Sequence, residues 1–287
     1  MDWENTPQSS NIEDRRGQGG GMGRGAGGLG IGAILIVLAI SYFTGINPAI
    51  LLGGAQMVAG NKTSAPAPSN APPANDRMTN LVRHVVGETE VVWGEVLPAQ
   101  KGIKYTNPTL VIYSGATQSG CGAAQAAMGP FYCPLDRKVY LDMAFFNDMQ
   151  TKFGGGGDFA YAYVISHEIG HHVQNLLGIL DKVDNAKASV SRTQANALSV
   201  RVELMADCFA GVWANHANEK WSNLLTADDI QRALATAKAI GDDRLQTAAR
   251  GYAVPDSFTH GSSEMRQQWL TTGLKTGQMD SCDTFSQ

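Results

Sequence analysis

The 287-residue sequence predicts an α+β fold, mainly helical with a small sheet, behind one N-terminal transmembrane helix. Three observations support this prediction. An uncharged apolar stretch near the N-terminus is long enough to cross a bilayer. Short apolar runs bounded by turn residues, which are typical of strands, occupy the first part of the remaining chain. Longer segments with the apolar spacing of helices follow to the C-terminus.

The composition is that of a globular protein with a core of useful size, since 43% of the residues are hydrophobic and 17% are charged. The formal net charge is −4, and the basic residues form no cluster along the chain. A nucleic-acid binder would show a basic patch or stripe. The sequence therefore predicts no nucleic-acid partner.

The apolar stretch has low-complexity sequence on both sides. Residues 25–61 contain no charged side chain, and 31–43 (IGAILIVLAISYF) are almost wholly apolar. Extended over 28–48, the stretch reaches the roughly 20 residues that a membrane helix needs. A cleaved signal peptide is the alternative, but its basic N-terminal region would be short, whereas 17–32 form a long glycine-rich tail. We therefore predict a membrane anchor.

Positive charges predict the orientation of this anchor. Arg15, Arg16 and Arg24 precede it, and only Lys62 lies close behind it. The positive-inside rule places the N-terminus in the cytoplasm and the chain after residue 60 outside. The predicted organisation is a cytoplasmic tail (1–27), a transmembrane helix (28–48), a juxtamembrane segment with a Pro/Ala-rich linker (49–76) and a folded domain (77–287).

Four cysteines lie in this outer domain: Cys121, Cys133, Cys208 and Cys282. An even number in an oxidising compartment predicts two disulfides. Cys121 and Cys133 are near in sequence and flank a predicted hairpin, which leaves Cys208 to pair with Cys282. A structural zinc site is the alternative, but no CxxC pair is present.

Apolar spacing predicts the elements of the domain. Strands are expected at 109–113, 129–132 and 138–142, the last two joined through a turn at 134–137. Helices are expected at 77–95, 158–177, 193–218, 227–240 and 262–274. Glycines at 154–157 interrupt the chain before the second helix.

That second helix contains His167-Glu168-Ile169-Gly170-His171. Histidines four residues apart lie on one helix face, so both imidazoles can reach one metal ion. Glu168 lies about 100° further round the helix, from where it can reach a metal-bound water. This is the HExxH arrangement of zinc peptidases. The helix is too apolar for a surface helix, and buried polar groups need partners.

The next helix offers Glu203 and Asp207, again one turn apart, within the apolar sequence VELMADCFAGVW. A catalytic zinc takes three protein ligands and leaves one position for water. Glu203 is the predicted third ligand. Asp207 is predicted to accept the N–H of a ligand histidine and so fix its tautomer. His172, which points off the metal face, is expected to make a structural hydrogen bond.

HEIGHH followed by ELMAD resembles the gluzincin pattern, in which a glutamate of the second helix is the third zinc ligand. The segments CGAAQAAMGPFYCPLDRKVYLD, HEIGHHVQN, ELMADCFAGVWA and THGSSEMR resemble a bacterial family of single-pass membrane proteins, the neutral zinc metallopeptidases. The resemblance implies a zincin-like domain with Zn²⁺ as cofactor. It also implies a bacterial inner-membrane location, with the catalytic domain outside the cytoplasm.

Thr259-His260 and Arg266 are similar to the TH…R element of the CAAX-processing and heat-stress membrane peptidases. There the His and Arg face the developing oxyanion, so His260 and Arg266 are predicted catalytic residues. Gly261 stands where those enzymes usually have proline. In the alternative interpretation, His260 caps or precedes the last helix.

The predicted reaction is hydrolysis of a peptide or protein substrate, with Glu168 as general base. We expect the substrate to pair as an extended strand with 140–142. Two alternatives remain at this point. One is a zinc-binding regulatory module without turnover, which would have no need of Glu168. The other is an amidase acting on cell-wall peptides by the same chemistry.

Overall fold

The computed structural model describes residues 1–16, 76–152, 156–222 and 224–286. The helices in this part are α3 (Arg77–Lys101), α4 (Ala144–Lys152), α5 (Asp158–Leu176), α6 (Ile179–Lys187), α7 (Arg192–Lys220), α8 (Ala227–Ala239), α9 (Asp242–Arg250) and α10 (Ser263–Thr276). The strands are β1 (Ile12–Asp14), β2 (Thr109–Tyr113), β3 (Ala116–Ser119), β4 (Gly122–Gln125), β5 (Phe131–Cys133) and β6 (Lys138–Asp142). The predicted α+β class with few strands is confirmed.

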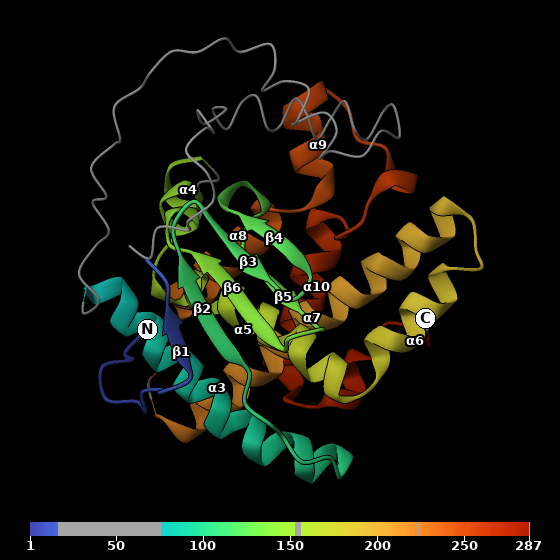
Figure 1. The fold of residues 1–287 in the computed structure, drawn as a ribbon. Coiled ribbons are helices and arrows are strands. Elements are labelled where there is room, and N and C mark those ends of the chain that lie inside the picture. The colour runs from blue at the N-terminus through green and yellow to red at the C-terminus, as the bar shows by residue number, and fades with distance from the viewer. Residues whose placement is uncertain (17–75, 153–155, 223, 287) are drawn as a thin grey trace, which may run out of the picture. The chain divides into compact units, whose positions relative to one another are not determined.

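The main sheet has the strand order β1-β2-β6-β5 (Figure 1). β1, β2 and β6 run parallel, and β5 is antiparallel to β6 at the far edge. The strand predicted to hold a substrate, 140–142, lies within β6, which is paired on both sides. Residue 140 has a partner in both neighbouring strands, so the prediction is wrong for it, whereas 141 and 142 are paired with β2 alone and the prediction stays a prediction for them.

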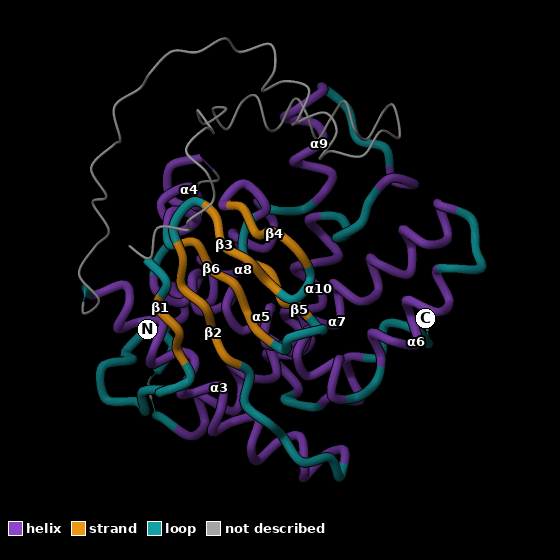
Figure 2. Tube along the Cα trace, viewed as in Figure 1, coloured by secondary structure: helices purple, strands orange, loops and turns teal. Residues whose placement is uncertain are grey.

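Side chains of β2 alternate between two apolar clusters on the two faces of the sheet. Leu110 and Ile112 belong to the large core that the helices fill. Val111 and Tyr113 belong to a small cluster that includes Ala124 of the β3–β4 hairpin. The sheet therefore lies between a helical layer and this hairpin, as Figure 2 shows by element type. Burial of both faces explains why β2 is a continuous apolar run.

Helix α5 lies at the centre of the helical layer and is buried over most of its length. Glycines bring its neighbours close. A Cβ on Gly170 of α5 would lie 3.1 Å from the carbonyl oxygen of Ala206 in α7. A Cβ on Gly273 of α10 would lie 1.9 Å from the carbonyl oxygen of Cys208. The backbones of α5, α7 and α10 can therefore approach closely only because these positions lack side chains.

Most predicted elements are close to the observed ones. Strands 109–113 and 138–142 match β2 and β6, and α7 extends the helix predicted at 193–218 by a few residues. Six elements were not predicted: α4, α6, α9, β1, β3 and β4. Each is short, and α9 has mean hydropathy too low to be recognised from an apolar stripe.

The sequence placed residues 1–27 outside the folded domain, and the structure corrects this for their first part. Residues 1–15 form one compact unit with 73–287. β1 pairs with β2, so this segment supplies a strand of the main sheet. Its sequence, Ile-Glu-Asp, has no apolar run and gave no strand prediction.

The predicted transmembrane helix, 28–48, lies outside the described residues. Among the helices that the structure does describe, none combines the length and the apolar character needed to span a bilayer. The predicted linker also lies outside the described part, apart from Asp76, whose carboxylate accepts the backbone N–H of Thr79 and caps α3.

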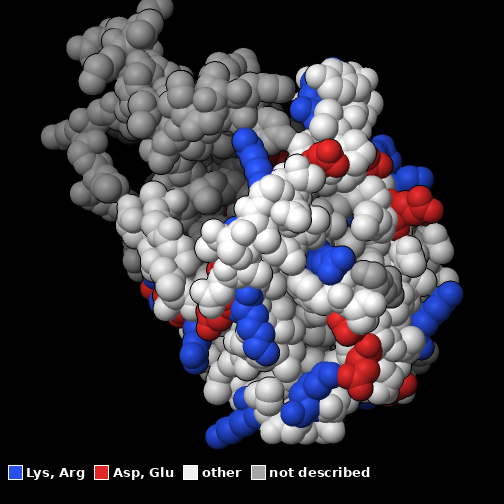
Figure 3. Space-filling view, turned by 90° about the vertical axis from the view of Figure 1, so that its right-hand side faces the viewer, with Lys and Arg blue, Asp and Glu red and all other residues white. Residues whose placement is uncertain are grey.

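Acidic and basic side chains are interspersed on the face of the domain shown in Figure 3. No large patch of one sign covers that face among the described residues.

The close packing of residues 1–16 on α3 generates a prediction. A Cβ on Gly87 would lie 2.4 Å from the carbonyl oxygen of Pro7, whereas a Cβ on Gly94 of the same helix would meet nothing within 4 Å. Gly94→Ala should leave the free energy of unfolding equal or raise it, by up to about 1 kcal/mol, through helix propensity. Gly87→Ala should lower it by about 1–3 kcal/mol through overpacking. Denaturant titration of the full chain measures both, and equal stabilisation by the two substitutions would show that Pro7 does not contact α3.

Candidate metal centre

Two helices bring the predicted metal ligands together. His167 and His171 lie one turn apart on α5, with ring centroids 4.8 Å apart. Glu203 extends from α7, which crosses α5 beside Gly170. One ligand atom from each of the three residues lies within 4.8 Å of the other two. The structure therefore assembles the predicted ligand set from positions far apart in sequence.

The distances between these atoms fit a zinc ion. Glu203 Oε2 lies 3.1 Å from His167 Nε2, and Glu203 Oε1 lies 3.5 Å from His171 Nε2. Tetrahedral ligands with zinc bonds of about 2.0–2.2 Å are separated by about 3.3–3.5 Å. Two imidazole nitrogens and a carboxylate also form the donor set of catalytic zinc sites. The residues present therefore fit this metal.

The opposite ring nitrogens of both histidines have hydrogen-bond partners that set the tautomer. His167 Nδ1–H donates to Asp207 Oδ1 at 2.8 Å. His171 Nδ1–H donates to Gln174 Oε1 at 2.9 Å, and the amide of Gln174 donates to the carbonyl oxygen of Val202. Because Nδ1 holds the proton, Nε2 of each ring has a free lone pair for a metal.

Charge in the site favours a cation. Burial alone would lower the pKa of His167, but the carboxylates of Asp207 and Glu203 outweigh it and raise that pKa to about 10. Burial would raise the pKa of Glu203, but His171 and His167 hold it well below its usual range. A site that stabilises protonated imidazoles also stabilises a metal cation that replaces those protons.

Asp207 is fully buried and joins three helices. Its carboxylate accepts hydrogen bonds from Arg266 Nε (2.8 Å) and Nη2 (2.9 Å), from the hydroxyl of Tyr163 (2.6 Å), and from His167. Burial would raise the pKa of Asp207, but Arg266 and His167 lower it to about 2. The residue therefore remains a carboxylate that orients His167, one of the candidate metal ligands.

Arg266 is placed differently from the prediction. Its guanidinium is buried, pairs with Asp207 and donates to the hydroxyl of Tyr163 at 3.2 Å. The prediction that Arg266 faces the oxyanion is corrected, because its charge is directed at a carboxylate behind the metal ligand. Arg266 acts on the site through Asp207 and His167, which makes it a positioning residue.

Glu168 lies beside the ligands without being one of them. The residue is only 8% exposed, and among the described residues its carboxylate has no hydrogen-bond partner. Its charge contributes to the raised pKa of His171, after the larger effects of burial and Glu203. A buried carboxylate without a protein partner is available to a water or substrate proton.

His260 lies on the loop before α10, near Glu203. Asp242 organises this loop, because its Oδ2 accepts the backbone N–H groups of Thr259 (2.7 Å), His260 (2.7 Å) and Gly261 (3.2 Å). Asp242 Oδ1 lies 3.4 Å from His260 Nδ1. Burial lowers the pKa of His260, but Asp242 and Glu203 outweigh it and raise that pKa. The ring is half-exposed, so Nε2 can meet a ligand from solvent.

The glycine after His260 has a physical reason. Gly261 has a φ of 98°, in a region that proline cannot adopt and that other side chains rarely do. A Cβ there would lie 3.1 Å from Leu204 Cδ2, next to the ligand Glu203. Glycine at position 261, where the similar enzymes have proline, therefore allows the loop to pack against α7.

His172 has the structural role that was predicted. Its Nε2–H donates to the carbonyl oxygen of Thr106 at 2.6 Å, and its Nδ1 accepts the hydroxyl of Tyr132 at 3.0 Å. It therefore ties α5 to β5 and to the segment before β2. Both of its nitrogens are engaged, so it is not a metal ligand.

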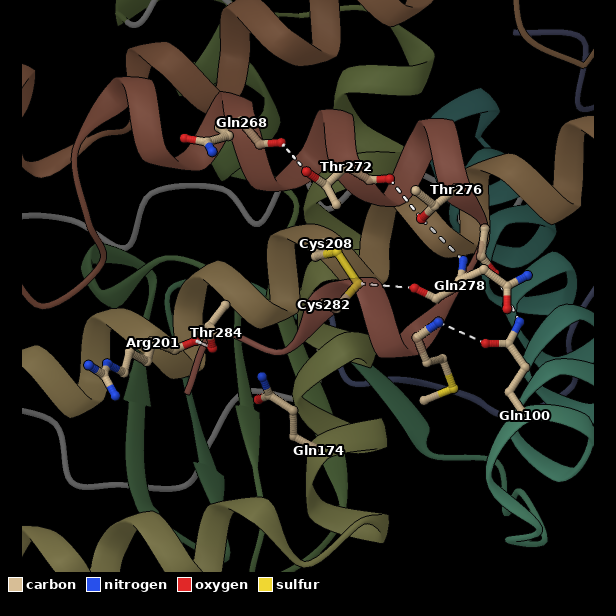
Figure 4. The surroundings of a disulfide bond; sticks show 12 residues. Gln100, Gln174, Arg201, Cys208, Gln268, Thr272, Thr276, Gln278, Cys282 and Thr284 are labelled. Atoms are coloured by element: carbon tan, nitrogen blue, oxygen red, sulfur yellow. Dashed lines mark hydrogen bonds between the residues drawn. A yellow bond between two sulfur atoms is a disulfide. The ribbon is translucent and has the colours of Figure 1, made fainter. Parts of the chain in front are cut away.

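Both predicted disulfides are present. Cys121–Cys133 joins the turn of the β3–β4 hairpin to the end of β5, so the hairpin contains Cys121 instead of lying between the two cysteines. Cys208–Cys282 joins α7 to the C-terminal segment, one residue after Asp207 (Figure 4). Thr284 also donates to the carbonyl oxygen of Arg201, which holds the C-terminal segment along α7.

Three contributors to the site were not predicted: Tyr163, Gln174 and Asp242. Gln174 follows His171 by three residues on one helix, so helical spacing could have indicated it. Tyr163 precedes His167 by four residues on that helix, so the same spacing could have indicated it, whereas Asp242 gave no such indication. Asp242 lies 18 residues before His260, and only the fold shows that the two meet.

A family model described as "Putative neutral zinc metallopeptidase" matches residues 1–285. The chain belongs to this family. It is similar to the uncharacterized protein YpfJ of Escherichia coli K12, with 41% identity over 99% of both chains. It is also similar to the uncharacterized protein Rv2575 of Mycobacterium tuberculosis H37Rv, with 44% identity over 69% of this chain and 67% of the relative. No solved structure matches.

The ligand geometry predicts the outcome of histidine substitutions. His167→Ala or His171→Ala should abolish stoichiometric zinc binding, because each removes one of three ligands. His216→Ala is the matched control. His216 donates to the carbonyl oxygen of Gly277 and lies 13 residues (216 − 203) after Glu203 on α7, about 20 Å along the helix, so its loss should leave zinc content unchanged. Metal analysis by mass spectrometry measures the three variants. Full zinc occupancy in His167→Ala or His171→Ala would contradict the ligand assignment.

Proposed function

We propose that this protein is a zinc-dependent peptidase that hydrolyses peptide bonds with Glu168 as general base. The observation that carries the proposal is the position of Glu168. Its buried carboxylate lies directly beside a His167–His171–Glu203 ligand set and has no partner among the described residues. A module that only binds zinc would have no use for this carboxylate.

The three ligand residues would hold zinc, and each has a defined task. Zinc, when bound, would supply a Lewis acid that lowers the pKa of a coordinated water to about 7 and polarises a carbonyl group. The carboxylate of Glu168 would take a proton from the attacking water and pass it to the leaving amine. Asp207, held by Arg266, would keep His167 in the tautomer that leaves Nε2 free.

His260 is proposed to stabilise the oxyanion. Asp242 holds its backbone, lies 3.4 Å from its Nδ1, and favours the protonated ring. A protonated imidazole can donate from Nε2 to the negative oxygen that develops during attack. The half-exposed ring also remains accessible to a substrate.

A peptide substrate is supported by the edge of the sheet. β5 is the last strand of the main sheet, is antiparallel to β6, and lies next to α5. An extended peptide can add to such an edge through backbone hydrogen bonds. The two disulfides support an oxidising, extracytoplasmic location for the domain.

The general-base assignment predicts that Glu168→Gln keeps zinc and loses activity. The amide has the same size but cannot accept the proton, so we expect a loss of about 10²- to 10⁴-fold in kcat. The assay uses the purified full chain with a diverse peptide library, with and without a chelator. Cleavage by Glu168→Gln at the wild-type rate, or cleavage that resists the chelator, would contradict the proposal. Zinc binding without any turnover would favour a regulatory module.

The position of His260 predicts a second kinetic effect. His260→Ala should lower kcat by about 10²- to 10³-fold while zinc stays bound, because the lost donor acts mainly when charge develops. Asp242→Asn should lower kcat less than His260→Ala does. It should also move the alkaline limb of the pH–rate profile, where His260 loses its proton, to lower pH, because the charge of Asp242 raises the pKa of His260. Loss of zinc in His260→Ala would instead identify a ligand, and an unchanged kcat would remove His260 from the mechanism.

A further inference from the structure

The first 16 residues are packed against the domain by side chains that are buried in the interface. Trp3 is 5% exposed, and its ring centroid lies 5.0 Å from that of His84 in α3. The indole N–H donates to Asp158 at 2.8 Å, at the start of the helix that holds the metal ligands. The segment therefore contacts both α3 and α5.

Polar groups of the segment and of α3 meet in this interface, partly or fully buried, and Glu88 Oε2 is the one atom among them that is buried without a partner. The hydroxyl of Thr6 lies 2.8 Å from Glu88 Oε1 and 3.1 Å from His84 Nδ1. Glu90 Oε1 accepts hydrogen bonds from Ser9 (2.6 Å) and Asn11 (2.7 Å). Buried polar groups without partners are costly, so α3 needs this segment to satisfy most of its polar face.

The backbone of the segment is paired as well. Leu110 N–H donates to the carbonyl oxygen of Asn11, and Arg15 N–H donates to that of Ile112. Glu13 also forms an ion pair with Lys138 of β6 at 2.8 Å. Such a ladder requires the strand to lie directly against β2, at the spacing of a sheet.

The sequence between the two parts of this folded unit is the uncharged, apolar stretch of 25–61, for which we expect contact with a bilayer. Residues 1–15 precede it, and 73–287 follow it. A β-sheet cannot form between strands on opposite sides of a membrane. A single crossing would leave β1 on one side and β2 on the other.

We propose that residues 1–15 lie on the same side of the membrane as the metal centre, because they and the domain form one folded unit. This replaces the predicted topology, in which the N-terminus is cytoplasmic and the domain is outside. The charge rule counted Arg15, which is a folded residue. Its guanidinium pairs with Glu13 at 2.8 Å and donates to the carbonyl oxygen of Gln118 at 2.8 Å.

Thiol labelling tests this proposal without any assay of activity. All four cysteines are in disulfides, so an introduced cysteine is the single free thiol of the chain. Ser10→Cys reports on the N-terminal segment, and Ser189→Cys reports on the domain, since both residues are exposed. Each full-length variant is expressed in Escherichia coli and treated in spheroplasts with a membrane-impermeant maleimide, before and after lysis. Unsubstituted protein is the control for background labelling.

We expect both variants in the membrane fraction and the same labelling of both, within about twofold, before lysis. If both variants are labelled only after lysis, they again lie on one side of the membrane, and that side is the cytoplasm. Labelling of one variant before lysis and of the other only afterwards would overturn the proposal. Recovery of the chain in the soluble fraction without detergent would overturn contact with the bilayer. Asn5→Cys, also exposed, repeats the test if Ser10→Cys fails to accumulate.

Discussion

The buried carboxylate of Asp207 is the interaction on which the site depends. It accepts hydrogen bonds from α5 through His167 and Tyr163 and from α10 through Arg266, while it extends from α7 itself. Removing one partner of a buried ion pair typically costs about 3–5 kcal/mol, because the remaining charge has no compensation. The relative placement of the three helices and the orientation of a metal ligand are therefore set by one group.

Close helix packing makes this network possible. Gly170 and Gly273 remove side chains where α7 passes α5 and α10, so that short polar side chains can meet across the interfaces. Cys208–Cys282 then holds the C-terminal segment against α7 beside Asp207. The site is consequently built on rigid helices, with only the loop of His260 outside them, and Asp242 fixes that loop through three backbone N–H groups.

Local spacing predicted which residues meet at the candidate metal centre, and tertiary contacts account for what it did not predict. His167 and His171, or Glu203 and Asp207, share a helix face by virtue of the helical repeat alone. Arg266 was assigned to the wrong partner, because sequence distance does not show which carboxylate a buried cation meets. β2 and β6 were recognisable as apolar runs. β1 was not, since its polar sequence becomes a strand only where β2 is available to pair with it.

The docked N-terminal segment also determines the order in which the chain can fold. Residues 1–15 are synthesised well before their partners, since Trp3 and Asp158 are 155 residues apart. β1 cannot enter the sheet before β2 exists, and such long-range parallel pairing is slow compared with helix formation. Until that pairing is complete, α3 exposes the polar and apolar groups that the segment covers, which is when a nascent chain is most vulnerable to aggregation and proteolysis.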